Sequence, residues 1–381
     1  MPSGMERRQG MTKLTVSIIG KTLVIADADG GALELVTAAP PPVDPPPPPP
    51  PPPPPQPPVV TPTTGIWIGA AEIAKLPTSG AGWTDVKAGA DAASGKTSLS
   101  NQDSNDSTGV KAAALIYART GEAVYLAKVK KAITDICTKN LESGSRALAL
   151  GRELIGYVLA ADIVQLKAVD ADLDAKWRVK LAALLTYKTS QAGSLIDCSL
   201  DRPNNWGGHS RASWLAAALY LGDKAGADRA VATLRGWMGD WDAYNGFEYG
   251  DLAWQIDKSK PVGVLPKGAT IQGYNVDGGQ PEELRRVAFH IPPSNVVYTW
   301  EGLQGPIAAA EMAYRAGYSD IWECCDKALL RAVQFNYRQG WAAEGDDKWI
   351  IPIINRAYGV SLPVTGGGAG KNVGWTLWTH Q

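Results

Sequence analysis

The chain has 381 residues, a formal net charge of −1, 45% hydrophobic residues and 20% charged residues. These values are those of an ordinary globular protein, and they give no electrostatic reason to expect nucleic acid or a membrane surface as a partner. No apolar run reaches the roughly 18 residues of a membrane-spanning helix. The first residues lack the hydrophobic core of a usual signal peptide, so the sequence leaves the localisation open.

The N-terminal part of the sequence predicts a small β-rich head, residues 1–38. Apolar and polar residues alternate there, and residues 15–25 are typical of two short strands with a turn. Residues 39–64 form a linker in which proline is unbroken from position 45 to position 55. Such a run dictates an extended polyproline II rod. Residues 65–381 then form the third and largest predicted domain.

This third domain is helical in pattern, with apolar residues three or four positions apart. Short glycine-containing junctions predict helical hairpins in a mainly α domain, arranged as an α/α toroid or incomplete helical barrel. The long loops, 239–297 and those after 340, should gather at one end of the helices. The apolar run 350–354 fits a buried strand or a helix. The predicted helices are 70–76, 107–120, 121–141, 145–169, 171–187, 206–221, 225–238, 298–317 and 320–338.

The aromatic residues suggest a binding function, whereas the cysteine spacing and the missing motifs indicate neither a metal site nor a cofactor site. The 14 Trp and 13 Tyr outnumber the 3 Phe, and rings with a polar handle stack on sugar faces, although they could equally fill a helical core. The four cysteines have no metal-ligand spacing, so we expect buried thiols and no metal site. The neighbours Cys324 and Cys325 are not expected to bridge. Phosphate-loop and dinucleotide motifs are absent, and we expect no cofactor.

A first polar cluster lies at the start of the predicted helix 206–221. Asn204, Asn205, Trp206, His209 and Arg211 combine amide, imidazole and guanidinium groups on a loop that leads into an apolar helix. Amides and arginine bind carboxylates. A uronate whose carboxylate is neutralised has a C5 proton acidic enough to be removed. The alternative is a helix capped by asparagine with a solvated histidine.

A second polar cluster follows at 277–298. Arg285, Arg286, His290 and Tyr298 bring a cation, a base and an acid into one stretch. These groups suit proton transfer at a bound anion. The alternative is a surface turn in which the two arginines pair with the two glutamates just before them.

A third cluster lies in the aromatic loop 244–254. Tyr244, Tyr249 and Trp254 are candidate sugar-binding residues, and Glu248 and Asp251 are carboxylates within the same loop. Paired carboxylates would serve a glycoside hydrolase as acid and as base or nucleophile. They could also bind sugar hydroxyls or hold the loop. In the C-terminal segment Arg356 and Tyr358 are further binding candidates, whereas His380 is expected to fray.

At these residues the chain resembles the alginate-lyase family of helical-toroid polysaccharide lyases, over roughly Ile66 to the C-terminus. Where the family commonly has histidine after the asparagine, this chain has Trp206. Where the family's tyrosine closely follows the arginine block, residues 291–295 intervene. The matching elements are Asn204-Asn205 with Leu219–Asp223, the block Asp277–Arg286, the helix Ala147–Leu166, and the C-terminal Asp346-Asp347, Asn355–Gly359 and Gly370–His380.

The resemblance implies β-elimination on a uronate-containing, alginate-like polysaccharide. Asn205 and Arg286 would neutralise the carboxylate, His209 or His290 would remove the C5 proton, and Tyr298 would protonate the leaving oxygen. His290 and Tyr298 compete for the role of the family's tyrosine. The head, proline rod and enzyme in series look like a phage-borne or surface-displayed depolymerase, with the head attached to a virion or surface structure.

Two alternatives to the lyase remain. A glycoside hydrolase on a similar toroid would use carboxylates such as Glu248, Asp251 or Glu301. A non-catalytic glycan-binding or virion structural protein would keep the scaffold and its aromatic residues, and Trp206 at the usual imidazole position favours that reading.

Overall fold

A computed structural model of the protein describes residues 15–19, 22–26, 32–33, 65–366, 369–371 and 373–380. The chain divides into two compact units, residues 1–56 and 57–381, and each is described by itself. The expected linker 39–64 and much of the expected head lie outside the described residues.

Three short strands belong to the first unit. They are β1 (Thr15–Ile19), β2 (Thr22–Ala26) and β3 (Ala32–Leu33), paired antiparallel in the order β1-β2-β3. The register aligns Val16 with Ile25 and Ile25 with Leu33. Both longer strands are rich in β-branched residues, which suit a pleated surface.

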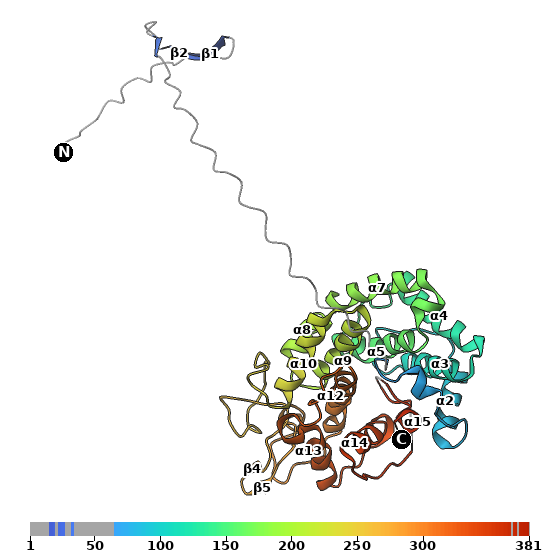
Figure 1. The fold of residues 1–381 in the computed structure, drawn as a ribbon. Coiled ribbons are helices and arrows are strands. Elements are labelled where there is room, and N and C mark those ends of the chain that lie inside the picture. The colour runs from blue at the N-terminus through green and yellow to red at the C-terminus, as the bar shows by residue number, and fades with distance from the viewer. Residues whose placement is uncertain are drawn as a thin grey trace, which may run out of the picture. The chain divides into compact units, whose positions relative to one another are not determined.

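The described part of the second unit is mainly helical, as the sequence predicts (Figure 1). A two-stranded β4–β5 ribbon, Thr270–Ile271 and Tyr274–Asn275, lies in its longest loop region. The helices of the first half are α1 (Ala70–Ile73), α2 (Ala81–Ala92), α3 (Asp106–Thr120), α4 (Ala123–Thr138), α5 (Ala147–Ile163), α6 (Leu166–Val169) and α7 (Ala171–Thr186). Those of the second half are α8 (Leu195–Asp201), α9 (Asn205–Leu221), α10 (Lys224–Met238), α11 (Pro281–Leu284), α12 (Tyr298–Arg315), α13 (Cys324–Arg338), the 3-10 turn η1 (Gly345–Asp347), α14 (Ile350–Tyr358) and α15 (Thr376–Thr379).

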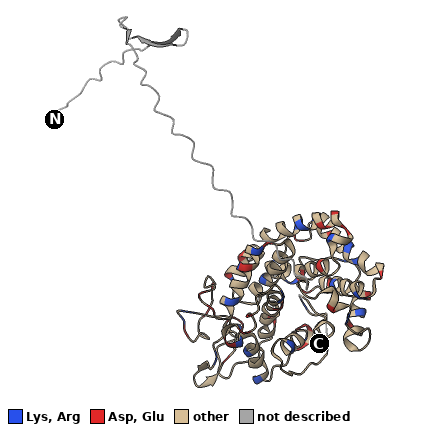
Figure 2. Cartoon of the chain, in the orientation of Figure 1, with Lys and Arg blue, Asp and Glu red and all other residues tan. Residues whose placement is uncertain are grey.

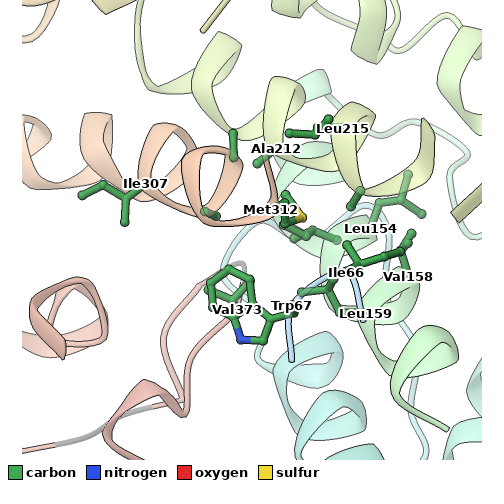
Figure 3. Close-up of a cluster of buried hydrophobic side chains, with 14 of the residues drawn as sticks. Ile66, Trp67, Leu154, Val158, Leu159, Ala212, Leu215, Ile307, Met312 and Val373 are labelled. Carbon is green, nitrogen blue, oxygen red and sulfur yellow. The ribbon is translucent and has the colours of Figure 1, made fainter. Parts of the chain in front are cut away.

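The core lies where α9 packs between α5 and α12 (Figure 3). Nearly every residue of α5 is buried, which explains why its sequence is mostly apolar, with Arg152, Glu153 and Asp162 as the charged exceptions. Each fully buried aliphatic side chain there contributes about 1.5–3 kcal/mol relative to exposure. The side chains that fill this core include Leu154, Val158, Ala212, Leu215, Ile307 and Met312.

Glycines let these three helices approach unusually closely. A Cβ atom on Gly305 of α12 would lie 2.2 Å from the carbonyl carbon of Gly208 in α9. A Cβ atom on Gly151 of α5 would lie 2.9 Å from the backbone nitrogen of Ser210. Any side chain at Gly151 or Gly305 would therefore push the helices apart. The close contacts fix the first turns of α9 against both neighbours.

Some elements differ from the sequence-based expectation. Helices α2 and α8 were not predicted, because α2 is rich in glycine and polar residues and α8 has only seven residues. The predicted helix 145–169 is divided at Gln165, whose φ of 52° is left-handed. The run 350–354 belongs to a helix. The predicted helix 320–338 begins instead at Cys324.

The C-terminal segment is anchored, so the expected fraying of His380 is wrong. His380 is only 2% exposed. The indole nitrogens of Trp375 and Trp378 donate to the carbonyls of Thr108 and Pro77, each at 2.8 Å. The buried ammonium of Lys111 donates to the carbonyl of Val373 at 2.7 Å. These bonds tie the segment to α3 and to the loop before α2.

Candidate functional site

Asn205 is the centre of the polar cluster at the N-terminal end of α9. The preceding Asn204 caps the helix, because its Oδ1 accepts a hydrogen bond from the backbone of Trp206 at 3.1 Å. Asn205 itself is 1% exposed. Its backbone N–H donates to Oε1 of Glu283 at 2.6 Å, and its Nδ2 donates to Oε2 of Glu301 at 3.4 Å. Asn204 thus caps the helix, as the alternative interpretation expects, whereas Asn205 belongs to the polar cluster.

Arg286 links Asn205 to Tyr298. Its Nη2 donates to Oδ1 of Asn205 at 2.9 Å, and its guanidinium lies 4.1 Å from the centroid of the Tyr298 ring. Tyr298 is 37% exposed at the start of α12, and the Arg286 side chain is 25% exposed. Arg286, in the loop after α11, therefore contacts both Asn205 of α9 and Tyr298 of α12, the residues with which it was expected to act.

A buried carboxyl group lies beneath this contact. Glu283 is 1% exposed, and its Oε2 is 2.6 Å from Nε of Arg286. Burial raises the pKa of Glu283 to about 7, although the ion pair with Arg286 opposes the shift. Near neutral pH, Glu283 therefore carries only part of a negative charge. The positive charge of Arg286 is then only partly neutralised by this buried carboxyl group.

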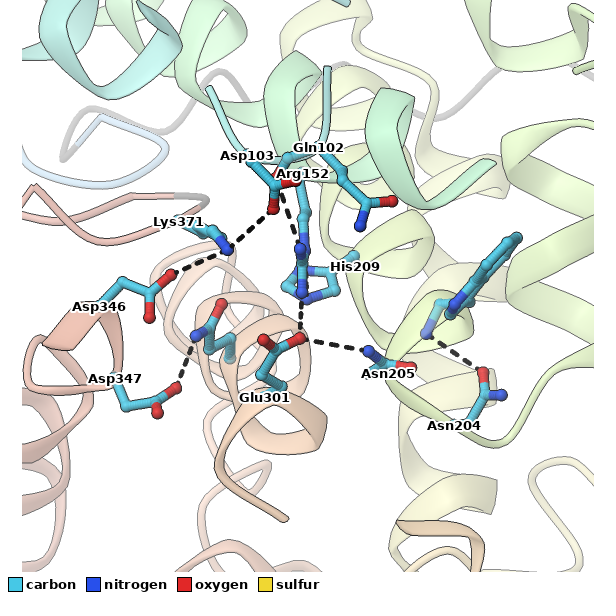
Figure 4. A network of polar contacts seen from close by, with 12 residues as sticks. Gln102, Asp103, Arg152, Asn204, Asn205, His209, Glu301, Asp346, Asp347 and Lys371 are labelled. Atoms are coloured by element: carbon cyan, nitrogen blue, oxygen red, sulfur yellow. Dashed lines mark hydrogen bonds and ion pairs between the residues drawn. The ribbon is translucent and has the colours of Figure 1, made fainter. Parts of the chain in front are cut away.

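Arg152 forms the other side of the cluster (Figure 4). This residue of α5 is 3% exposed and forms an ion pair with Glu301 of α12. Its Nε donates to Nε2 of His209 at 3.3 Å, and its Nη1 donates to the carbonyl of Gln102 at 3.4 Å. His209 is fully buried. The imidazole is therefore positioned behind the arginine, away from solvent.

Further acidic groups adjoin Glu301. Asp347 is bound through its Oδ1 by Nε2 of Gln304 at 2.6 Å. Burial, together with the nearby charges of Asp346 and Glu301, raises the pKa of Asp347 to about 7, although the hydrogen bond from Gln304 opposes the shift. Nζ of Lys371 lies 3.3 Å from Asp346 and 3.5 Å from Asp103, which precedes α3. The C-terminal segment thereby contributes a second carboxyl group close to Glu301 (Figure 4).

Trp206 is half-buried beside this cluster. The Arg146 guanidinium lies 5.9 Å from the centroid of the Trp206 ring and donates to Oε1 of Gln102 at 2.6 Å. An indole with a cation near it can stack on a sugar ring and face an anionic substituent. The binding role of Trp206 stays a prediction, with a cation beside its ring.

Arg211 does not reach the cluster. It is fully buried, donates through Nε to Thr233 at 3.1 Å and through Nη2 to the carbonyl of Ser199 at 3.3 Å, and lies over the Phe247 ring. These contacts all belong to the interior of the unit. The structure therefore corrects the expectation that Arg211 binds substrate.

The loop 244–254 has mostly structural contacts. The Tyr244 hydroxyl donates to the carbonyl of Leu200 at 2.9 Å, and Trp254 is 1% exposed against Phe289. Tyr249 packs edge-to-face on Phe247, with its hydroxyl buried. Only Glu248 and Asp251 of the expected loop residues are exposed. Arg285 pairs with Glu282 at 2.8 Å, as its alternative interpretation predicts.

Three further candidates lie in other surroundings. His290 is exposed, with its Nδ1 2.7 Å from the carbonyl of Pro292. Arg356 forms an ion pair with the buried Glu311, and the Tyr358 hydroxyl donates to the carbonyl of Trp322 at 2.8 Å. These contacts lie away from Asn205, Arg286 and Tyr298.

The residue that sequence reasoning missed is Arg152. Its signal was the pair Arg152-Glu153 inside the otherwise apolar stretch 147–161, because a charge in a fully buried helix requires a partner. Among the described residues, no group of three or more His, Cys, Asp and Glu side chains is arranged to hold a metal ion.

Basic and acidic residues are interspersed over the helical unit in Figure 2 rather than separated by sign. No helix in the described ranges is both long and apolar enough to cross a membrane. In comparisons with known proteins, no protein-family model and no curated protein matches this chain.

Proposed function

We propose that the protein is a polysaccharide lyase that cleaves a uronate-containing, alginate-like polymer by β-elimination. The observation that carries this proposal is the contact of Asn205, Arg286 and Tyr298, an amide, a guanidinium and a partly exposed phenol. β-Elimination needs a partner for the carboxylate and a group that moves a proton, and these three residues supply both.

The uronate carboxylate would bind at Arg286, with Asn205 holding the guanidinium in place. Electron withdrawal by the neutralised carboxylate acidifies the C5 proton. Tyr298 suits the proton transfer because its ring touches Arg286 and its side chain is exposed, whereas His209 is fully buried. As phenolate, Tyr298 would take the C5 proton. As phenol, it would return that proton to the departing O4, leaving a C4–C5 double bond.

The arrangement of the helices supports an α/α toroid, left incomplete, as the scaffold. Helices α3, α5, α9 and α12 contact one another in series, and α4, α10 and α13 pack on them in turn. In such a double row the connections lie at the helix ends, and the long loops would gather at one of these ends. In this proposal the expected head and proline rod would attach the enzyme to a virion or another surface.

The test is ultraviolet absorbance during incubation with a panel of uronate polymers, alginate first. A lyase produces a C4–C5 double bond conjugated to the carboxylate, so the absorbance rises as the polymer shortens. Asn205→Ala should lose this signal, with Asn204→Ser as the matched control that keeps the helix cap. Full activity of Asn205→Ala would contradict the proposed site.

A glycoside hydrolase is the second candidate, favoured by one observation. Glu301 is held by Arg152 and Asn205, while the neighbouring Asp347 has its pKa raised to about 7. Two carboxyl groups in such different surroundings are typical of an acid and a base or nucleophile. Falling viscosity without new absorbance, abolished by Glu301→Gln, would favour this candidate. Binding without any shortening of the polymer would favour a glycan-binding or structural role.

A further inference from the structure

The adjacent cysteines at the start of α13 lie outside the candidate site, and their thiols are in contact. Sγ of Cys324 and Sγ of Cys325 are 3.3 Å apart. Cys324 is buried and Cys325 is half-buried, and all four cysteines of the described chain are free thiols. The distance is short enough for one thiol to donate to the other, so the two sulfur atoms form one chemical unit.

The backbone around the pair adopts a rare conformation. Cys325, Asp326 and Lys327 have φ values of 51°, 55° and 58°, which lie in the left-handed region that side chains disfavour. Residues held in such conformations cluster at functional sites, where the surrounding structure keeps them in place. In this turn the two sulfur atoms are in contact.

Arg331 holds this turn in place. Its Nη2 donates to the carbonyl of Cys325 and its Nε to the carbonyl of Asp326, both at 2.9 Å. Its Nη1 lies 2.7 Å from Oδ1 of Asp277. The guanidinium of Arg331 is thus held by Asp277 on one side and binds the carbonyls of two left-handed residues on the other.

A cavity of about 270 Å³ opens beside Cys325. Lys260, Lys267 and Arg331 contribute to its lining, together with Asp257 and Asp326. Gly239 also lines it, and a Cβ atom there would lie 3.8 Å from Sγ of Cys325. A small molecule in the cavity would therefore meet the Cys325 sulfur directly, whereas Cys324 lies behind it.

The two thiols differ in reactivity. The hydrogen bond from Cys324 lowers the pKa of Cys325, which favours its thiolate, although burial and Asp240 oppose this. Arg235 and Arg331 add positive charge near the pair. The thiolate is the nucleophile in disulfide exchange. Cys325 is therefore the attacking sulfur, and Cys324 is in position to resolve the product.

We propose that Cys324 and Cys325 form a redox-active dithiol that exchanges with a small, carboxylate-bearing disulfide bound in this cavity. The Cys325 thiolate attacks one sulfur of the disulfide and expels the first thiolate. Cys324 then loses its proton and attacks the Cys325 sulfur of the mixed disulfide, expelling the second thiolate. The protein gains one Cys324–Cys325 disulfide, contrary to the sequence-based expectation that these neighbours do not bridge, because their sulfur atoms are already in contact. The two protons of the cysteines pass to the expelled thiolates, so the small disulfide is reduced to two thiols.

The experiment treats the reduced full-length protein with oxidised glutathione and follows intact mass and alkylation. We expect a loss of two hydrogen atoms without a lasting adduct, and protection of both cysteines from alkylation. Cys324→Ser should instead accumulate one glutathione on Cys325, because no resolving thiol remains. Cys137→Ser, at a half-buried thiol on α4, is the matched control and should behave as the unchanged protein.

Two outcomes would overturn the proposal. One is a lasting adduct on Cys325 in the unchanged protein, and the other is no reaction at the pair while Cys137 reacts.

A second variant tests the cavity. Lys267→Gln should slow the reaction with oxidised glutathione about fivefold, the effect of one nearby charge in water, and leave the rate with an uncharged disulfide unchanged. Equal slowing with both disulfides would contradict the role of the cavity.

Discussion

Nη2 of Arg286 donates a hydrogen bond of 2.9 Å to Oδ1 of Asn205, although 81 positions separate the two residues. This bond orients the amide so that its Nδ2 faces Glu301. It also holds the guanidinium against the ring of Tyr298. One hydrogen bond thus joins the two polar clusters of the sequence.

Tyr298→Phe removes only the phenol oxygen. If Tyr298 transfers the proton, kcat on the active polymer should fall by about 10²–10⁴-fold, with little change in KM, because the ring still packs on Arg286. Tyr314→Phe is the control, since Tyr314 lies on the same helix and is 45% exposed. An unchanged kcat for Tyr298→Phe would show that another residue transfers the proton.

Glu283→Gln tests how the buried carboxyl group tunes Arg286. The pKa of Glu283 is raised to about 7, so its negative charge disappears as the pH falls through 7 and Arg286 becomes free to bind an anion. KM for a uronate polymer should therefore decrease from pH 8 to pH 6. In Glu283→Gln it should stay at the low value throughout. The same pH dependence in both proteins would exclude Glu283 as its origin.

Arg152→Lys tests the ion pair behind the site. Lysine cannot reach Gln102, His209 and Glu301 together, because its ammonium is a point charge and not a planar fork. The charge is retained and the Glu301 side chain is 20% exposed, but buried hydrogen-bonding groups lose their partners, so the free energy of unfolding should fall by about 1–3 kcal/mol. Urea denaturation measures this change. The control is Lys224→Arg, because Lys224 forms an exposed ion pair with Asp228. A change below about 1 kcal/mol would indicate a solvated pair.

Glu153→Gln tests a buried acid that the proposed chemistry does not use. Burial raises the pKa of Glu153 from 4.5 to about 8 in the folded protein. Its contribution to stability is therefore complete below pH 4.5 and is lost as the pH rises towards 8. Relative to the unchanged protein, Glu153→Gln should gain about 2–4 kcal/mol between pH 5 and pH 8.5. The exposed variant Glu122→Gln should gain nothing in parallel urea titrations.

Gly305→Ala tests the close crossing of α9 and α12. The new methyl group would lie 2.2 Å from the backbone of Gly208, so we expect a loss of about 1–3 kcal/mol and reduced activity through displacement of α9. Gly109→Ala on α3 is the matched control. Its methyl group would meet Ala93 at an ordinary 3.5 Å, so it should be neutral or stabilising. Thermal denaturation of both variants decides between these outcomes.

The sequence by itself determined the helical character of residues 65–381 and most helix positions. It did so because apolar residues recur at helical spacing and glycine marks the helix ends, both of which are local signals. It also pointed to Asn205, Arg286 and Tyr298. Local patterns do not, however, reveal where a helix breaks against its neighbours, as at Gln165, or whether a terminal segment is anchored, as at His380.

Only the tertiary structure decided which polar residues meet. Arg211 and His209 lie two positions apart on α9, so they face different directions: Arg211 points into the interior, and His209 lies against Arg152 of α5. Arg152 itself resembles a core residue in the sequence. The partners of a buried charge come from distant helices, and their contact depends on how closely the helices cross at Gly151 and Gly305.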